Sequence, residues 1–358
     1  MPEREQWVSH VNTRLQEFLE ARAQDMFALG HDVTSFDTFA RKFLTGGKRF
    51  RALCALHGFK IRGADLSKNA IDIAAALEVF HAAALVHDDI MDSSDTRRGN
   101  PSAHRAFERL HADSGWAGDG ASFGVNSALL FGDLLLAYCD ELIAHALTDV
   151  DRTTRERTRA EFDRMRREVT LGQYLDVVEE RAWPIVSVDE ALDRAGRVVV
   201  YKSAKYSIEA PLVIGAALAG ASDDELDALR SFGLPLGFAF QLRDDMLGVF
   251  GDPDVTGKPA GDDIREGKRT VLIALAMERL GPSEVTELNH LLGDRSLSQE
   301  QISSVRSTLV ECGAHDEVEL LISNYVTQAL HALDESAFEQ QTSDALRELA
   351  LGVTNRVS

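Results

Sequence analysis

A long run at positions 69–92, NAIDIAAALEVFHAAALVHDDIMD, constrains the fold of this chain more than any other stretch. Apolar side chains recur in it every three or four residues, which is the period of an α-helix. They cover much of the helix circumference and leave little polar surface to face solvent. The run therefore predicts a helix buried in the middle of a helical bundle.

The rest of the sequence predicts the same architecture. The segments 127–147 and 167–180 repeat the three- and four-residue apolar spacing, and no proline interrupts the chain between Pro101 and Pro184. Strand-like alternation is not evident. Loops are predicted where Gly and Pro gather, at 45–48, 97–101 and 251–263. We predict an all-α fold, a single large helical bundle.

Composition and charge limit the compartment and the partners. The three cysteines form no C-x-x-C pair, and the N-terminus lacks a basic segment followed by an apolar one. No run approaches the roughly 18 uncharged apolar residues that span a bilayer. The net charge of −20 disfavours nucleic acid and anionic membrane surfaces as partners. We predict a soluble, cytoplasmic protein without an integral membrane segment, whose acidity mainly provides solubility.

An acidic cluster follows the apolar run, in HDDIMDSSDTRRGNP at 87–101. Asp88 and Asp92 are four residues apart and project from one helix face, and Asp89 lies three residues before Asp92. Carboxylates this close together raise one another's pKa unless a nearby cation neutralises their charge. A hard cation such as Mg2+ suits them, whereas the alternating pattern of an EF-hand is missing. Alone, the cluster would more often be a solvated helix end.

A second acidic pair weakens that simpler interpretation. Asp244 and Asp245 follow another apolar helix in FAFQLRDDMLGVFGD, at 238–252. Two acidic helix ends together with scattered cations suit a diphosphate that is held by Mg2+ on one side and by Lys and Arg on the other. The cations are Lys48, Arg51, Arg97, Arg98, Lys202, Lys258 and Lys268.

Five ordered blocks now make the chain recognisable. They are GGKRFR (46–51), LVHDDIMDSSDTRRG (85–99), GQYLD (172–176), YKSAKYS (201–207), and FQLRDD with GKPAGDDIREGKRT (257–270). In this order they resemble the signature blocks of the trans-isoprenyl diphosphate synthases, or polyprenyl synthetases, most like geranylgeranyl diphosphate synthases. The resemblance covers about residues 40–280, with an unassigned helical tail at 281–358. It implies one all-α domain over 1–358 around a deep central cavity, as a homodimer.

The resemblance also implies a Mg2+-dependent site with three ions, in which Mn2+ can substitute. The implied metal ligands are Asp88, Asp89, Asp92, Asp244 and Asp245, with Asp244 acting from the wall opposite the first cluster. The diphosphate of isopentenyl diphosphate would be held by Lys48, Arg51, His81 and Arg98. The allylic diphosphate would be held by Arg97, Lys202, Ser203, Gln241, Lys258 and Lys268. The catalytic residues among these would be Asp88, Asp92, Lys202, Asp244 and Lys258.

Some of these residues also have plainer interpretations. His81 could be a core histidine, and Gln241 a buried amide satisfied by the backbone. Two positions depart from the family pattern: Gly248 stands where the second motif ends in aspartate, and Ser203 stands where threonine is more usual. The first departure predicts weaker metal binding at worst, and the second keeps the hydroxyl.

The implied reaction is a head-to-tail condensation of isopentenyl diphosphate with dimethylallyl, geranyl or farnesyl diphosphate. Mg2+, Lys and Arg neutralise the departing diphosphate, so that the allylic C–O bond ionises in a site shielded from water. The double bond of isopentenyl diphosphate attacks the cation, and a proton passes to the departing diphosphate. No side-chain nucleophile is needed, which agrees with the absence of a G-x-S-x-G motif. The Gly-rich loop 251–263 is a candidate lid.

Product length depends on the residues that precede Asp88. In this family, bulky aromatics four and five positions before the first aspartate stop growth at fifteen carbons, but here Ala84 and Ala83 occupy those positions. The next large side chain is Phe80. Moving the floor from five to eight residues back deepens the cavity by about 4.5 Å, roughly one isoprene unit. We therefore expect geranylgeranyl diphosphate, C20, and we expect Phe80→Ala to lengthen the product.

Several alternatives remain. If Phe80 turns aside, the chain would be a synthase of longer polyprenyl diphosphates. A non-catalytic, regulatory subunit of a heteromeric synthase would be expected to lose aspartates or basic residues, and nearly all are present. A terpene cyclase would carry an N-D-x-x-S-x-x-x-E motif and would not need Lys48 and Arg51. The preferred primer and the downstream pathway stay open.

Overall fold

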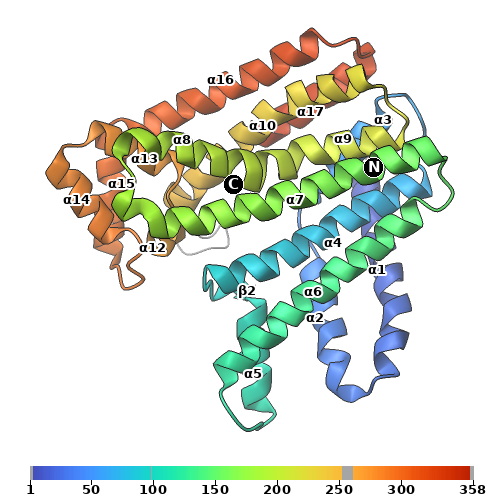
Figure 1. Ribbon diagram of the computed structural model, residues 1–358, viewed down its shortest axis with the longest axis horizontal. Helices are drawn as coiled ribbons and strands as arrows, with labels where there is room; N and C mark the ends of the chain where they lie inside the picture. The colour runs from blue at the N-terminus through green and yellow to red at the C-terminus, as the bar shows by residue number, and fades with distance from the viewer. Residues whose placement is uncertain (1–2, 98, 252–260, 355–358) are drawn as a thin grey trace. The chain divides into compact units, whose positions relative to one another are not determined.

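The computed structural model describes residues 3–97, 99–251 and 261–354, and almost all of them lie in helices (Figure 1). The elements are α1 Glu3–Phe27, η1 His31–Val33, α2 Thr34–Leu44, α3 Phe50–Lys60, α4 Lys68–Met91, β1 Thr96–Arg97, β2 Asn100–Pro101, α5 Ala103–Asp113, α6 Gly120–Ala146, α7 Arg152–Ala182, η2 Trp183–Ile185, α8 Val188–Val198, η3 Val199–Glu209, α9 Ala210–Leu218, α10 Asp223–Phe250, α12 Asp262–Glu266, α13 Val271–Arg279, α14 Pro282–Leu291, α15 Gln299–Glu311, α16 Ala314–Asp334 and α17 Gln340–Thr354. The predicted all-α fold is confirmed.

Two of the three predicted loops lie between described elements. The first separates α2 from α3, and the second holds the turn of a small antiparallel hairpin, β1–β2. The sequence does not predict this hairpin, because its two-residue strands are too short to show alternation. Most of the third loop, 252–260, lies outside the described residues.

The chain divides into two compact units. The first unit contains Met1–Arg159 and Pro211–Ala221, and the second contains Ala160–Ala210 and Ser222–Ser358. The chain therefore changes unit three times: within α7, at the start of α9, and just before α10. The single domain expected over 1–358 stays a prediction.

In the first unit, α4 is the central helix. Ser67 caps its N-terminus by accepting a hydrogen bond of 3.1 Å from the Ala70 N–H. Most of the side chains that follow are buried, as the apolar run predicts. α6 lies alongside α4 (Figure 1). The two helices approach closely at Gly132, where a Cβ would lie 2.2 Å from Nε2 of His87. The absence of a side chain there allows this packing.

α4 also has the length and composition of a membrane-spanning helix, and within the described residues no other helix does. This differs from the expectation that no run of the chain approaches the composition of a bilayer span. In the structure, 72 % of the apolar window of α4 is buried inside the protein, as in the core helix of a soluble protein. Neighbouring helices therefore cover its apolar surface.

In the second unit, the core forms around α10, α13 and α16. α10 begins with a capping box in which Ser222 and Glu225 each bond the other's backbone N–H. It continues through an internal proline, Pro235, to Phe250. Between α8 and α9 the backbone winds more widely, as a π-helix, η3. Such wide turns often occur at functional sites, and η3 contains the YKSAKYS block.

Candidate active site

The loop between α2 and α3 carries two residues that are predicted to hold isopentenyl diphosphate. Gly46 and Gly47 have φ angles of 77° and 85°, a left-handed conformation that glycine adopts without strain. They turn the chain before Lys48, which is exposed, and Arg51, which is half-buried in the first turn of α3. A third predicted residue, His81, is half-buried on α4 in the same unit.

One stripe of α4 stays partly exposed, and it contains His81, Ala84, Leu85 and Asp88. These residues are spaced three and four apart, so they share one face of the helix. Ala83 is fully buried and lies on another side. Of the two small residues predicted to shape the cavity floor, only Ala84 is therefore on the face of Asp88.

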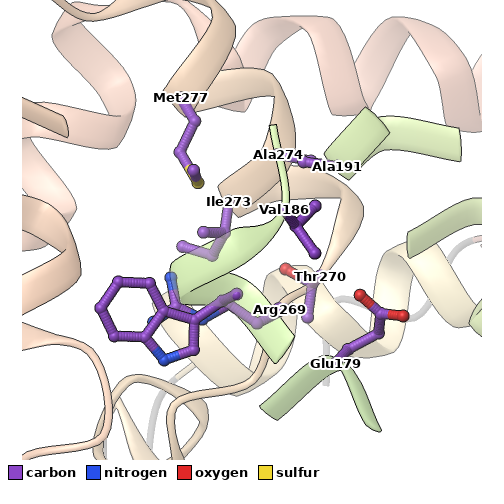
Figure 2. A pocket seen from close by; sticks show the side chains of 9 residues that line it. Glu179, Val186, Ala191, Arg269, Thr270, Ile273, Ala274 and Met277 are labelled. Atoms are coloured by element: carbon purple, nitrogen blue, oxygen red, sulfur yellow. The ribbon is translucent and has the colours of Figure 1, made fainter. Parts of the chain in front are cut away.

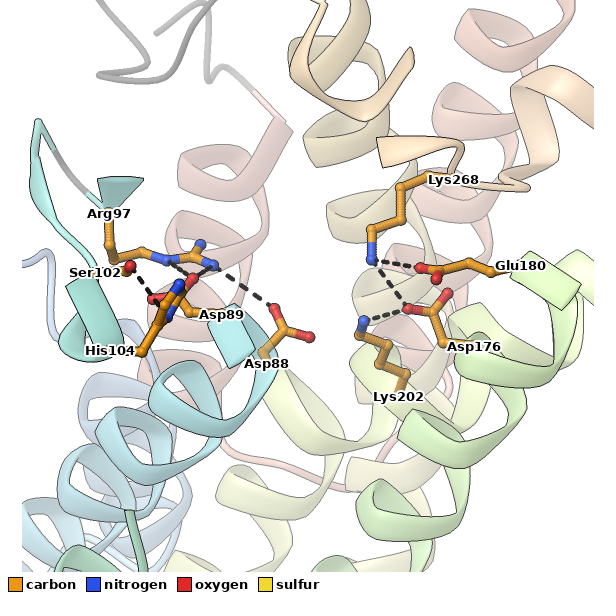
Figure 3. A network of polar contacts seen from close by, with 9 residues as sticks. All are labelled: Asp88, Asp89, Arg97, Ser102, His104, Asp176, Glu180, Lys202 and Lys268. Carbon is orange, nitrogen blue, oxygen red and sulfur yellow. Dashed lines mark hydrogen bonds and ion pairs between the residues drawn. The ribbon is translucent and has the colours of Figure 1, made fainter. Parts of the chain in front are cut away.

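The first acidic cluster lies at the C-terminal end of α4. Asp89 is completely buried, and its carboxylate accepts two hydrogen bonds from the guanidinium of Arg97, one of them 2.9 Å long from Nε. The same guanidinium lies 3.7 Å from Oδ2 of Asp88 (Figure 3). Asp92 is the C-cap residue of the helix and is also buried. Burying a carboxylate is costly unless it is paired, so Arg97 compensates for the burial of Asp89.

The β1–β2 hairpin determines where that arginine lies. Arg97 pairs with Asn100 in the ladder, and the turn includes Gly99 with a φ of 72°. Ser102 follows the hairpin, and its Oγ lies 3.2 Å from Nδ1 of His104 (Figure 3). Arg98, the second arginine of the predicted site, lies outside the described residues.

In the second unit, two predicted lysines converge on one carboxylate. Lys202, from η3, forms a short ion pair with Oδ2 of Asp176 on α7. Lys268 lies 3.4 Å from the same oxygen and 3.2 Å from Oε1 of Glu180 (Figure 3). Lys202 and Lys268 belong to different sequence blocks, and the fold brings both to the carboxylate of Asp176. Asp176 and Glu180 were assigned no role from the sequence.

Two glycines allow η3 to approach its neighbours in the second unit. A Cβ on Gly172 of α7 would lie 2.3 Å from the backbone N of Lys202, and a Cβ on Gly237 of α10 would lie 2.3 Å from the carbonyl oxygen of Ala204. Both contacts are with backbone atoms, which cannot move aside as a flexible side chain can. Gly172, the glycine of the GQYLD block, therefore lets η3 pack close enough for Lys202 to reach Asp176.

The second acidic motif is organised by amide and hydroxyl groups. Ser203 donates a hydrogen bond to the side-chain oxygen of Gln241, and the amide nitrogen of Gln241 donates one of 2.6 Å to Asp245. Gln241 is thus a satisfied amide, but its partners are side chains rather than the backbone. Burial, together with the neighbouring carboxylates of Asp263 and Asp244, raises the pKa of Asp245 well above its usual range. A cation at this motif would lower it again.

Gly248, the position without the family's last aspartate, lies against another carboxylate. A Cβ on Gly248 would lie 1.9 Å from Oδ2 of Asp263, so Asp263 occupies the space beside α10 that a side chain would take. Asp263 is one of two acidic residues in the first turn of α12, with Asp262. Lys258 and most of the predicted lid lie outside the described residues.

The donor atoms at both acidic motifs fit a hard divalent cation, because they are carboxylate oxygens without sulfur or imidazole nitrogen. In the first unit the predicted ligands are Asp88, Asp89 and Asp92, of which Asp89 accepts hydrogen bonds from Arg97. In the second they are Asp244 and Asp245, and Asp176 and Glu180 also place carboxylate oxygens within 4.8 Å of each other. The assignment of individual ligands stays a prediction.

A small pocket in the second unit contains none of the predicted site residues (Figure 2). Arg269 lies beside it with its guanidinium 4.4 Å from the ring centre of Trp183, and burial lowers the pKa of Arg269 to about 10. The pocket has room for only about one or two water molecules. The pocket is therefore too small to be a substrate site.

Two further residues near the predicted site are not identified by the sequence analysis. Arg49, within the GGKRFR block, is buried, and Glu78 on α4 is buried beside it. A charged residue in a recognised block could have drawn attention to Arg49. Glu78 stands within an apolar helix, and its charge was the available signal for a buried polar contact.

Comparisons with known proteins agree with this geometry. The sequence profile of the family described as polyprenyl synthetase matches residues 34–309. Geranylfarnesyl diphosphate synthase of Aeropyrum pernix is 31% identical over 315 residues, which cover 87% of this chain and 91% of that protein. Geranylgeranyl diphosphate synthase of Sulfolobus acidocaldarius is 32% identical over 309 residues, covering 86% of each.

A solved structure is similar over nearly the whole chain. Geranylgeranyl pyrophosphate synthase from Corynebacterium glutamicum, complexed with isoprenyl diphosphate and magnesium, shares 40% identity and superposes with a TM-score of 0.91. The match covers 98% of this chain and 98% of that chain.

Proposed function

Because the chain belongs to the polyprenyl synthetase family, we propose that it condenses isopentenyl diphosphate with an allylic diphosphate to make geranylgeranyl diphosphate, C20. The reaction class, trans-prenyl chain elongation by a prenyltransferase, follows from the family. The observation that carries the proposal is the convergence of Lys202 and Lys268 on Asp176. Two ammonium groups that meet at one carboxylate oxygen could also bind the several negative charges of a diphosphate.

In this proposal, basic residues of the first unit hold isopentenyl diphosphate. Lys48 and Arg51 flank the start of α3, and the backbone N–H groups of that helix end also favour an anion. His81 and Arg98 complete the proposed set. Holding the diphosphate leaves the far end of the molecule, the reacting double bond, to be oriented by apolar side chains.

The allylic diphosphate is assigned to the other basic residues. Arg97, Lys202 and Lys268 supply fixed positive charge, and Ser203 and Gln241 supply hydrogen bonds; Lys258 is the remaining member. The family is magnesium-dependent, and Mg2+ held by Asp88, Asp89, Asp92, Asp244 and Asp245 would neutralise the leaving diphosphate as a Lewis acid. We propose three ions, with Mn2+ as a substitute.

The proposed C20 product rests on the face of α4 that carries Asp88. Ala84 lies on this face and is small, and Phe80 precedes it by one helical turn and is 5% exposed. A growing chain that passes Ala84 would therefore meet the aromatic ring of Phe80 next. One similar protein is named a geranylgeranyl diphosphate synthase and another a geranylfarnesyl diphosphate synthase, which makes a longer product. Product analysis therefore tests the proposed length.

We further propose that the working state is a homodimer and that the protein is soluble and cytoplasmic. An apolar stripe on α6, made of Val125, Leu129 and Leu130, is 40%, 49% and 59% exposed. Val125 and Leu129 are four residues apart and share one face, and Leu130 lies about 100° further around the helix. A second copy of the chain is the proposed occupant of this stripe. Leu129→Asp with Leu130→Asp should then yield monomers in light scattering, whereas an unchanged mass would contradict the proposed interface.

Product analysis tests the function. Purified protein receives Mg2+, labelled isopentenyl diphosphate and, separately, dimethylallyl, geranyl or farnesyl diphosphate. We expect C20 as the dominant product, and longer products from Phe80→Ala. Products beyond C20 from the unaltered protein would keep the reaction class and contradict the floor. Folded protein that elongates no primer would indicate a subunit that needs a partner.

A further inference from the structure

Arg49 differs from the two basic residues beside it in the GGKRFR block. Lys48 is exposed and Arg51 is half-buried, but Arg49 is only 5% exposed. Its backbone has a φ of 52°, the left-handed conformation that residues other than glycine rarely adopt. A strained, buried arginine persists only when its surroundings hold it in place.

Three separate elements of the first unit hold this side chain. The Nε of Arg49 donates a hydrogen bond of 2.8 Å to Asn12 of α1, and a terminal nitrogen donates to the carbonyl oxygen of Leu44 at the end of α2. The other terminal nitrogen lies 3.4 Å from Oε2 of Glu78 on α4. The guanidinium therefore ties the loop that carries Lys48 to three helices.

Glu78 makes a second contact with the same region. Its other oxygen, Oε1, accepts a hydrogen bond of 3.1 Å from the backbone N–H of Ala52, in the first turn of α3. The Ncap position of α3 is Arg49, whose own side chain does not cap the helix. A carboxylate from another helix therefore does what a capping side chain usually does. It accepts a hydrogen bond from a backbone N–H at the start of α3, and its negative charge interacts favourably with the positive end of the helix dipole.

We propose that Arg49 and Glu78 are positioning residues for the diphosphate of isopentenyl diphosphate, an inference that rests on the proposed function. Arg49 anchors the loop immediately after Lys48, and Glu78 anchors the first turn of α3, which carries Arg51. Neither side chain needs to touch substrate. Together they fix the separation and direction of the two cations that do, so their loss should weaken binding of one substrate more than the other.

The test compares two arginines that pair with α4 carboxylates. Arg49→Met removes the three polar contacts and keeps a long apolar stem. The matched control is Arg14→Met, because Arg14 of α1 is likewise ion-paired with a buried carboxylate of α4, that of Asp72. For Arg49→Met we expect the KM for isopentenyl diphosphate to rise at least about 10-fold, while the KM for the allylic primer changes less than about 2-fold. For Arg14→Met we expect both KM values to stay within about 2-fold of the unaltered protein.

A second variant separates charge from capping. Glu78→Gln keeps an oxygen that can accept from the Ala52 N–H, but it loses the ion pair with Arg49. It should give a smaller rise in the KM for isopentenyl diphosphate than Glu78→Leu, which removes both contacts. Circular dichroism and thermal unfolding of all variants show whether they fold.

Two results would overturn the inference. One is an equal rise of both KM values in Arg49→Met, and the other is a loss of thermal stability with both KM values unchanged, as in the control. If the unaltered protein elongates no primer, the proposed function fails instead. The inference is then decided by calorimetry, in which Arg49→Met must bind isopentenyl diphosphate at least about 10-fold more weakly than Arg14→Met.

Discussion

The two acidic motifs bury a carboxylate in different ways. In the first unit, Asp89 is buried against the guanidinium of Arg97, which comes from the hairpin just after the helix. In the second unit, Asp245 is buried against the neutral amide of Gln241, with the carboxylates of Asp263 and Asp244 nearby. The buried carboxylate of the first motif is paired with a guanidinium, whereas that of the second motif accepts a hydrogen bond from a neutral amide.

This difference indicates a division of labour. A motif that contains its own arginine holds its geometry whether or not metal is present. A motif in which burial and neighbouring carboxylates raise the pKa of an aspartate gains more from a divalent cation, because the cation reduces the repulsion among those carboxylates. Binding of Mg2+ should therefore stabilise the second unit more than the first.

The largest expected effect comes from removing the internal cation of the first motif. Arg97→Met leaves the carboxylate of Asp89 buried without its guanidinium, and we expect the free energy of unfolding to fall by about 3 kcal/mol. Denaturant titration followed by circular dichroism measures the change. The control is Arg105→Met, since Arg105 pairs with the exposed Asp95 and its loss should cost about 0.5 kcal/mol. Equal losses in the two variants would contradict the comparison.

Sequence spacing could predict the parts of the site that lie within one helix or one hairpin. Asp88 and Asp92 are four residues apart on α4, and Arg97 follows a few residues later, so short-range geometry brought them together. The convergence of Lys202 and Lys268 on Asp176 could not be derived in this way, because the pairs are 26 and 92 residues apart in the chain. The resemblance to a family placed the two lysines together, but it assigned no partner to them.

Buried polar contacts were hardest to predict from the sequence. In the sequence, Arg49 is one of several basic residues in a motif, and Glu78 is a single charge in an apolar helix. Their ion pair depends on how α3 packs against α4. The wide π-helical winding of η3 has no simple sequence signal either. Both features arise from tertiary packing, which local propensity does not encode.

The second prediction concerns the close contact between α7 and η3. Gly172→Ala would place a Cβ against the backbone of Lys202, so η3 must shift and the lysine must move relative to Asp176. A displacement of about 1 Å at a catalytic group can reduce the rate about 100-fold, and we expect kcat to fall by about that factor. Steady-state kinetics with saturating substrates measure it.

A glycine with room around it provides the control for that change. In α8, a Cβ on Gly196 would have its nearest neighbour 4.0 Å away, on Phe238. Gly196→Ala should therefore leave kcat unchanged and increase stability by up to about 1 kcal/mol, because alanine favours the helix. If Gly172→Ala also keeps full activity, the tight approach of η3 to α7 is not needed for catalysis.

The third prediction sharpens the contrast between the motifs by adding charge to the second. Gly248→Asp displaces the carboxylate of Asp263 and adds a negative charge near Asp245, so the metal-free protein should lose about 1–2 kcal/mol of stability. Gly248→Ala isolates the steric part. Added Mg2+ should raise the thermal midpoint of the Asp variant more than that of the Ala variant. Equal shifts would show that the added carboxylate does not reach the cation.

The smallest effect is a different response of the two units to acid. Burial lowers the pKa of His57 in the first unit to about 4, so the unfolded chain takes up a proton near pH 6.5 that the folded unit does not. Stability from this site is therefore present above pH 6.5 and is lost as the pH falls, by about 1 kcal/mol at pH 5.5.

In the second unit, burial raises the pKa of Glu209. The folded unit then binds the proton more readily than the unfolded chain, and it gains stability as the pH falls from neutral toward that pKa.

Hydrogen exchange at pH 7.5 and pH 5.5, corrected for intrinsic rates, measures both responses in one sample. Peptides of α3 should lose protection at the lower pH, and peptides of η3 should lose less or gain. His57→Phe keeps an aromatic ring against Trp7, which His57 contacts at 5.0 Å between ring centres, but it cannot be protonated. The variant should abolish the loss in α3 and leave η3 unchanged. If α3 still loses protection in the variant, another group in the first unit controls its acid sensitivity.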